Sequence, residues 1–179
     1  MELKENTWKK REKLFNLASN PWEGRMNTMV GLIDFTSTSS IMDLGCGGGR
    51  LRELLPDCMT YIPVDYKLRD GVDDIVICDF NNDEFPNIDA DVAFMAGILE
   101  YIHDPAAFIS DICRHCNTVI ISYNEYHFWK MTKKKRESIG WINHLSRKRF
   151  VEMFINSGFE LTGWAHKRGQ GPVFRFDKR

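Results

Sequence analysis

Short, almost uninterrupted apolar segments recur along the chain and are typical of buried β-strands. They are rich in β-branched side chains and lie at 39–44, 59–64, 74–78, 91–95 and 118–123. Strands that are apolar on both faces have to be covered by helices on both sides. The pattern therefore predicts a parallel sheet enclosed by helices.

Amphipathic stretches alternate with these segments and favour helices. The first, 51–55, follows a glycine-rich turn and ends at Pro56. The second begins after Asp104, a good N-cap, and the third runs from Ser146 to a stop at Gly158. Strands that alternate with helices indicate a right-handed, doubly wound α/β sheet.

The C-terminal part of the chain has a different pattern. Two predicted strands, 159–165 and 172–176, are separated only by the segment His-Lys-Arg-Gly-Gln-Gly. So short a connection cannot hold a crossover helix, because parallel strands need a dozen or more residues between them. We therefore expect an antiparallel hairpin at the edge of the sheet.

The most informative segment is the turn that leaves the first predicted strand, Asp43-Leu-Gly45-Cys-Gly47-Gly-Gly49. Glycine permits positive φ and lets a ligand approach the backbone closely. We expect a helix to begin at Gly49 and to present free N–H groups. The spacing differs from the G-x-G-x-x-G dinucleotide fingerprint, and no Gly-Lys-Ser/Thr follows as in a P-loop. Asp43 would repel a pyrophosphate but suits an ammonium group.

Acidic residues also end the next two predicted strands. Asp65 and Tyr66 end the second strand, where a carboxylate can accept both hydroxyls of a ribose. Asp79 and Phe80 end the third strand and suit the edge and the face of an adenine. Each acid alone is also typical of a solvated turn. Because these acids occur in order at the ends of successive strands, they together predict a nucleoside site without a phosphate cradle.

Composition narrows the class of protein. The chain has 179 residues, 43% of them hydrophobic, which suits one compact domain with a sizeable core. Lys and Arg number 24 against 25 Asp and Glu, so bulk charge gives no case for nucleic acid. No apolar run is long enough for a membrane span, and the N-terminus lacks the apolar stretch of a signal peptide. The five cysteines predict a reduced, cytoplasmic protein, and Cys113-x-x-Cys116 has no second pair, so we expect no metal.

The motifs together resemble those of the class I (Rossmann-like) S-adenosylmethionine-dependent methyltransferases. The resemblance runs from about residue 10 to the C-terminus. The segment 43–49 matches the family's first motif, Asp65 its ribose-binding acid, and Asp79-Phe80 its adenine-side motif. The segment 97–105 resembles the family's stretch after the fourth strand, where many members carry Leu-Glu-His and this chain has Tyr101 in place of the histidine. Segments 120–129 and 143–145 look most like the MetW-type branch.

This resemblance implies a doubly wound, mostly parallel seven-stranded sheet with an antiparallel C-terminal hairpin strand. It also implies that S-adenosyl-L-methionine is the cofactor and S-adenosyl-L-homocysteine its product. The domain would span 1–179, with an N-terminal helical cap at 1–38, a cofactor-binding half at 39–123 and an acceptor-side half at 124–179. The expected cofactor-binding residues are Asp43, Gly45, Cys46, Gly47, Gly49, Asp65, Tyr66, Asp79, Phe80, Ala96 and Gly97.

The acceptor side offers one candidate for catalysis. His144 lies just before a predicted helix and has a suitable ordinary pKa for a general base, although a histidine bonded to a loop backbone would look the same. His103, before the Asp104 cap, is more typical of a structural role. The side chains expected to line the acceptor pocket are Trp22, Tyr101, Tyr123, Asn124, Tyr126 and His127. The aromatic members of this set are equally typical of packing.

A basic run bears on the choice of acceptor. It comprises Lys130, Lys133, Lys134, Lys135, Arg136, Arg147, Lys148 and Arg149. Such a run is usually a solvated helix face, but it could also attract an anionic acceptor. We expect methyl transfer to an O or N of a small-molecule or sugar-containing acceptor, rather than to RNA. The alternative is a cofactor-binding accessory subunit of another enzyme, and a homodimer or a partner enzyme is compatible with so short a chain.

Overall fold

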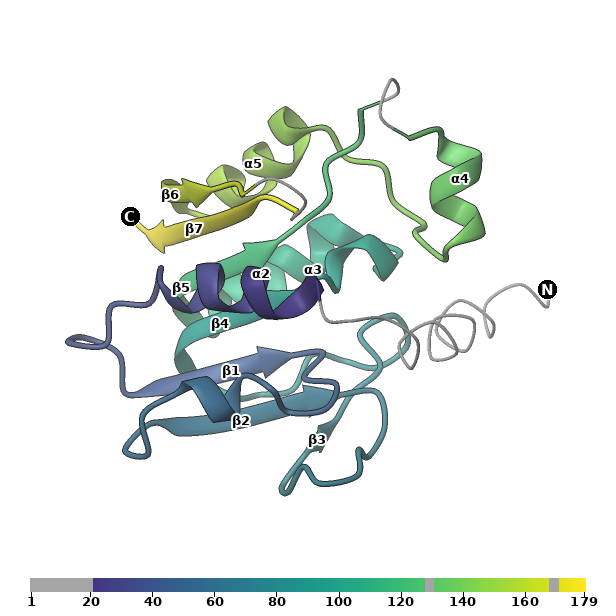
Figure 1. Ribbon diagram of the computed structural model, residues 1–179. Coiled ribbons are helices and arrows are strands. Elements are labelled where there is room, and N and C mark those ends of the chain that lie inside the picture. Colours follow the sequence, from purple (N-terminus) through teal and green to yellow (C-terminus); the bar gives the residue numbers. More distant parts are fainter. Residues whose placement is uncertain (1–20, 128–130, 168–170) are drawn as a thin grey trace.

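The computed structural model describes residues 21–127, 131–167 and 171–179 of the chain. Its strands form one seven-stranded sheet in the order β3-β2-β1-β4-β5-β7-β6 (Figure 1). The strands are β1 (Ser40–Leu44), β2 (Thr60–Asp65), β3 (Val76–Ile77), β4 (Ala90–Ala96), β5 (Cys116–Ser122), β6 (Phe159–Ala165) and β7 (Val173–Lys178). β1 to β5 are parallel to one another, and β7 runs antiparallel to both β5 and β6. This is the expected fold, including the C-terminal hairpin.

Helices cover both faces of the central strands (Figure 1). The described helices are α2 (Pro21–Val30), α3 (Pro105–Arg114), α4 (Lys133–Ser138) and α5 (Arg147–Asn156), with 3₁₀ turns η1 (Arg52–Leu54) and η2 (Leu99–Tyr101). Side chains alternate along β4, so that Ala93 and Met95 face a core shared with α3 and α5. Val92 and Phe94 face a second core shared with α2. This two-sided burial explains why the central strands are apolar throughout.

The two predicted helix caps are confirmed in α3 and α5. Asp104 accepts a hydrogen bond from the backbone N–H of Ala107 at 3.0 Å, and Ser146 accepts one from Arg149 at 3.4 Å. Phe150 and Phe154 of α5 are fully buried against the hairpin, where the rings of Phe154 and Phe176 stack at 4.0 Å. These contacts fix the hairpin beside β5.

The connections between β1 and β4 differ from the expectation. No α-helix begins at Gly49; the chain makes only the single turn η1 before β2. Pro56 explains this end, because a residue before proline is pushed out of helical geometry, and Leu55 is extended at φ −96° and ψ 148°. The connections at 66–75 and 78–89 are also without helix, and β3 is a two-residue strand at the sheet edge. Among the described residues, no helix has the length and apolar character needed to cross a bilayer.

Candidate functional site

The glycine-rich turn between β1 and η1 contains three left-handed residues. Gly45, Gly47 and Gly49 have φ angles of 76°, 55° and 69°, which side-chain-bearing residues rarely adopt. A Cβ on Gly45 would lie 2.9 Å from Ile98, and one on Gly49 would lie 2.9 Å from Val72. A Cβ on Gly47 would meet nothing within 4 Å. The outer glycines therefore serve close packing, whereas the backbone at Gly47 faces open space that a ligand can occupy.

The backbone N–H groups of this turn are largely used inside the protein. Those of Gly45 and Cys46 donate to the carbonyl of Val64 at 2.8 and 3.1 Å, and that of Gly49 donates to the carbonyl of Cys46 at 3.0 Å. The expectation of a free N–H at Gly49 is therefore wrong, because no α-helix starts there. These three amides are not available to a phosphate, in keeping with a site for a nucleoside.

Asp65, at the end of β2, lies directly against the glycine turn. Its Oδ2 accepts the N–H of Gly47 at 2.9 Å, and its Oδ1 accepts a hydrogen bond from Arg69 at 2.9 Å. The guanidinium of Arg69 lies over the ring of Tyr66, 5.1 Å from its centre. Each carboxylate oxygen has a second lone pair, so Asp65 can accept further hydrogen bonds from ribose hydroxyls.

Asp43 is the second acid at this edge of the sheet and is 3% exposed. The phenol of Tyr61 donates to its Oδ2 at 2.8 Å. Burial raises the pKa of the Asp43 carboxyl to about 7, and the hydrogen bond from Tyr61 partly offsets this rise. The sequence pattern did not indicate Tyr61, because its contact with Asp43 exists only through the pairing of β1 with β2.

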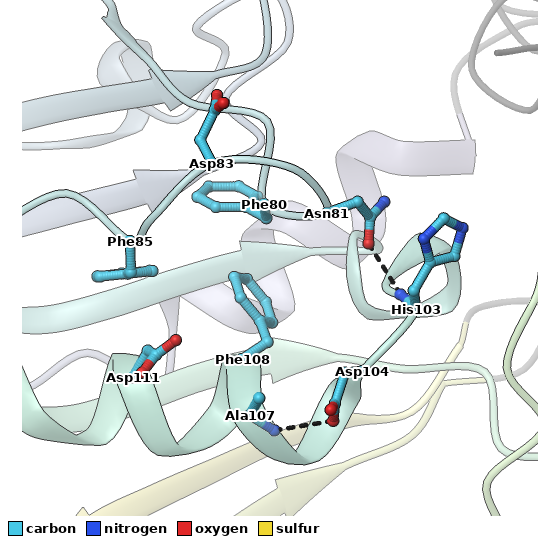
Figure 2. Close-up of a pocket in the computed structure, with 9 residues that line it drawn as sticks. All are labelled: Phe80, Asn81, Asp83, Phe85, His103, Asp104, Ala107, Phe108 and Asp111. Atoms are coloured by element: carbon cyan, nitrogen blue, oxygen red, sulfur yellow. Dashed lines mark hydrogen bonds between the residues drawn. The ribbon is translucent and has the colours of Figure 1, made fainter. Parts of the chain in front are cut away.

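The two residues of the adenine-side motif, Asp79 and Phe80, have different surroundings in the structure. The carboxylate of Asp79 accepts hydrogen bonds from the backbone of Asn81 at 3.0 Å and the side chain of Asn82 at 2.7 Å. The ring of Phe80 packs against Phe108 at 4.9 Å between centres, and lines a cavity of about 210 Å³ beside α3 (Figure 2). The ring of Phe80 thus packs on α3 but is only partly buried, and its stacking on an adenine stays a prediction.

The other expected cofactor-binding residues lie at the same strand ends. Ala96 ends β4, and Gly97 follows with a φ of 75°; both are half-buried. Cys46 is buried in the glycine turn, and burial raises the pKa of its thiol to about 12. The Cys46 thiol is thus a packing group at neutral pH.

Two of the expected pocket-lining tyrosines are buried instead. The phenol of Tyr101 accepts a hydrogen bond from the indole N–H of Trp141 at 3.0 Å. The phenol of Tyr123 donates to Asn143 at 2.7 Å and accepts the backbone N–H of Leu145 at 2.8 Å. These contacts fix the loop at 141–145 against the strand ends, and they argue against a role of either phenol in lining an acceptor pocket.

Arg136 of α4 holds the same loop from the other side. It is 2% exposed, although the basic run had suggested a solvated face. Its guanidinium donates to the carbonyl of Asn124 at 2.8 Å and to that of Asn143 at 3.2 Å. It also lies 4.6 Å from the centre of the Trp141 ring. The neighbouring Lys133, Lys134 and Lys135 are exposed, so the basic run is not one continuous face.

His144 is placed by this arginine. Its Nδ1 accepts a hydrogen bond from Nε of Arg136 at 3.1 Å, and its Nε2 lies 3.4 Å from Glu137. Because a guanidinium can only donate, Nδ1 must carry the lone pair of a neutral imidazole and Nε2 the proton. The one basic nitrogen is thus already engaged, which argues against the predicted role of His144 as the general base.

The remaining predicted acceptor residues gather where β5 ends. Nε2 of His127 lies 3.2 Å from Glu125, whose carboxylate also accepts a hydrogen bond from Arg147 at 2.8 Å. The ring of Tyr126 lies 5.6 Å from that of His144, and Asn124 bonds to Glu100. His103 is exposed and its backbone N–H donates to Asn81, as suits a structural turn. Trp22 falls in the first turn of α2, and its side chain lies outside the described residues, as do 1–20 of the expected cap.

Comparison with solved structures finds the same fold in several methyltransferases. The N-methyltransferase NodS from Bradyrhizobium japonicum WM9, in complex with S-adenosyl-L-homocysteine, is 14% identical with a TM-score of 0.71, and 97% of this chain aligns with 99% of NodS. Magnesium protoporphyrin IX methyltransferase from Synechocystis PCC 6803 is 11% identical with a TM-score of 0.69, covering 98% and 96% of the two chains. A chain bound to the Haloferax volcanii Trm112 methyltransferase activator is 16% identical, with a TM-score of 0.66 and 87% and 91% coverage. At these identities the likeness shows the fold alone.

Sequence comparisons give the family. No curated protein matches the chain significantly. The methyltransferase-domain family matches residues 14–168, which is most of the chain and includes the glycine turn, Asp65 and the β5 end. Neither result singles out the MetW-type branch, which stays a prediction. By this match and by its fold, the chain belongs to the methyltransferase-domain family and is a class I S-adenosylmethionine-dependent methyltransferase.

Proposed function

We propose that this protein transfers the methyl group of S-adenosylmethionine to an oxygen or nitrogen of a small-molecule or sugar-containing acceptor. The observation that carries the proposal is the open space in front of Gly47, whose backbone N–H is held by Asp65, the acid at the end of β2. A site of this kind admits a nucleoside, because its carboxylates accept hydroxyl and ammonium donors. The amides of Gly45, Cys46 and Gly49 are already bonded within the protein.

The residues present fit this cofactor. Asp65 would accept the ribose hydroxyls while it holds the glycine turn through Gly47. Asp43 would provide the negative charge for an ammonium group. The bound sulfonium supplies an activated methyl group with a good leaving group. The protein's part is to align the acceptor with that methyl group and to exclude water.

The segment that follows β5 would receive the acceptor. We assign the cofactor to the half at 39–123 and the acceptor to the half at 124–179. The acceptor-side loops are tied down by Arg136, Tyr123 and Trp141 through buried hydrogen bonds. Exposed lysines at 133–135 lie on α4 next to these loops and would favour an acceptor with negative charge.

Calorimetry with S-adenosylmethionine and S-adenosylhomocysteine tests the site. In Gly47→Val a side chain would fill the space that the ligand needs, so we expect binding to be lost. Gly48→Ala is the matched control, because a Cβ there also meets nothing within 4 Å and Gly48 is not left-handed. Circular dichroism shows whether each variant is folded. Unchanged affinity in a folded Gly47→Val protein would refute the placement of the cofactor at this turn.

A second candidate function is that of a cofactor-binding accessory subunit of another enzyme. One structural neighbour comes from a complex with the Haloferax volcanii Trm112 methyltransferase activator, so a chain of this fold can act together with a partner protein. Turnover separates the two functions. Formation of S-adenosylhomocysteine by the purified protein with an acceptor supports an independent enzyme, whereas binding without turnover until a partner is added supports the subunit.

A further inference from the structure

A buried carboxylate in the 3₁₀ turn after β4 has one oxygen without a partner among the described residues. Glu100 lies in η2 and is 1% exposed. Its Oε1 accepts hydrogen bonds from the backbone N–H of Asn124 at 3.0 Å and from the side-chain amide of Asn124 at 2.8 Å. Its Oε2 is fully buried and has no hydrogen-bond partner within the described chain. Buried polar atoms are nearly always bonded, so this oxygen points to a group that binds there.

A second orphaned atom lies at the end of the adjacent strand. The hydroxyl of Ser122 is buried, with 0% exposure, and also lacks a partner among the described residues. Ser122 pairs in register with Ala96, where β4 ends, and it precedes Asn124 by two positions. Both orphaned atoms thus belong to residues of the half at 39–123 that adjoin Asn124, the first residue of the acceptor-side half: Glu100 bonds to it, and Ser122 precedes it by two positions.

The carboxylate is held rigidly in this position. The backbone carbonyl of Glu100 accepts the N–H of Ile142 at 2.9 Å. Asn124, which fixes Oε1, is itself fixed by Arg136, which donates to its carbonyl at 2.8 Å. Asn124 is thus bonded both to the carboxylate of Glu100 and to the guanidinium of Arg136. A carboxylate prepared in this way is suited to a charge-assisted hydrogen bond.

We propose that Glu100 Oε2, assisted by the hydroxyl of Ser122, binds the N–H of an amine acceptor and takes its proton; this rests on the function proposed above. The nitrogen lone pair forms the new bond to the methyl carbon. The bond between carbon and sulfur breaks, and its electron pair stays on sulfur, which leaves a thioether. The proton of the methylated nitrogen passes to Oε2 of Glu100 and from there to solvent. Covering side chains have to move aside as the acceptor enters, because Oε2 is shielded from solvent.

Glu100→Gln and Ser122→Ala test this assignment, with Glu160→Gln, an exposed carboxylate on β6, as the control. Glutamine keeps an oxygen for Asn124 and replaces Oε2 by a group that cannot take a proton. The acceptors are amines of graded size that also carry a carboxylate, from glycine to 4-(aminomethyl)benzoate, each with its matched alcohol. We expect methylation of amines by the natural protein, a loss of about 10²- to 10⁴-fold in Glu100→Gln, and an unchanged rate in Glu160→Gln.

Two further measurements do not depend on turnover. Saturation-transfer NMR of the complex with S-adenosylhomocysteine should detect amines with the natural protein and not with Glu100→Gln. Melting temperature and cofactor affinity should stay the same or rise in Ser122→Ala, because that substitution removes a buried atom without a partner. If Glu100→Gln does not fold, Ser122→Ala still tests the proposal, because we expect this variant to bind amines more weakly than the natural protein.

Several outcomes would overturn the assignment. The first is a rate of amine methylation in folded Glu100→Gln that lies within threefold of the natural rate. The second is methylation that depends on Glu100 but occurs with the alcohols alone. The third is that no amine binds to the natural protein. If both Glu100→Gln and Ser122→Ala had a lower melting temperature and an unchanged rate of amine methylation, Glu100 and Ser122 would have only a structural role. Failure of the proposed function is distinguishable, because S-adenosylmethionine would then not bind at all in calorimetry.

Discussion

Asp43 shows how one buried residue can couple ligand binding to pH. It is almost fully covered, receives a hydrogen bond from Tyr61 and has a pKa raised to about 7 by burial. Between the ordinary value of 3.8 and about 7, the unfolded chain releases the proton of this carboxyl before the folded chain does. The free energy of unfolding therefore receives a contribution from Asp43 that falls as pH rises through this range.

Binding of the cofactor should show the opposite trend. An ammonium group beside Asp43 favours the charged carboxylate, so binding at lower pH has to remove a proton first. We expect the affinity for S-adenosylmethionine to rise between pH 5.5 and 7, by at most about tenfold per pH unit, and then to level off. Calorimetry across this range measures the slope, with Asp43→Asn as the control that cannot titrate. An equal slope in Asp43→Asn would show that another group is responsible.

At the scale of elements, α4 and the loops on either side of it depend on one buried guanidinium. Arg136 donates to Asn124, Asn143 and His144, and no carboxylate of the described residues lies within ion-pair distance of it. Its charge is instead stabilised by carbonyl dipoles and by the Trp141 ring. The loops at 124–127 and 141–145 are thus ordered by tertiary hydrogen bonds, because neither has regular structure of its own.

Removing this guanidinium should loosen both loops. We expect Arg136→Met to lower the free energy of unfolding by about 3–5 kcal/mol, because buried carbonyls lose their donors. Lys134→Met, an exposed position on the same helix, should stay within about 0.5 kcal/mol. Urea unfolding followed by circular dichroism measures both. Similar stability of the two variants would mean that Arg136 does not hold the loops together.

At the scale of the whole molecule, the two halves of the sheet are supported differently. β4 and β5 lie between packed helices, with their apolar side chains buried on both faces. β3 pairs through only two residues, is connected by helix-free segments on both sides, and leaves Ile77 51% exposed. Local stability should therefore decrease from the centre of the sheet toward β3.

Hydrogen exchange measured by mass spectrometry can test this gradient. Amides at 66–77 should exchange much faster than those of β4 and β5, whose opening requires loss of the core. Saturating S-adenosylmethionine should slow exchange at 66–77, because Asp65 and Arg69 lie in this part of the site, while β5 serves as the internal control. Equal exchange rates in all strands would contradict this view. So would a ligand that slows amide exchange equally in β5 and at 66–77.

Much of the molecule followed from local patterns in the sequence. Apolar runs located the strands, since burial on both faces leaves no polar positions, and Asp104 and Ser146 correctly located the starts of α3 and α5. The glycine turn and the acids at Asp43 and Asp65 were identified because strand ends of a parallel sheet meet at one edge. Those features depend on neighbours along the chain and on general rules of sheet geometry.

The tertiary structure decided what depends on contacts between distant residues. Tyr61 reached Asp43 only through strand pairing, and the ring of Phe80 turned toward α3 because Phe108 offered a packing surface there. Arg136 appeared in the sequence as part of a charged run, but its hydrogen bonds bury it and engage the basic nitrogen of His144. Likewise, Asn124 binds one oxygen of Glu100, while the other has no partner among the described residues. The sequence by itself thus determined which strand ends form the proposed cofactor edge, and packing decided which side chains remain available for chemistry.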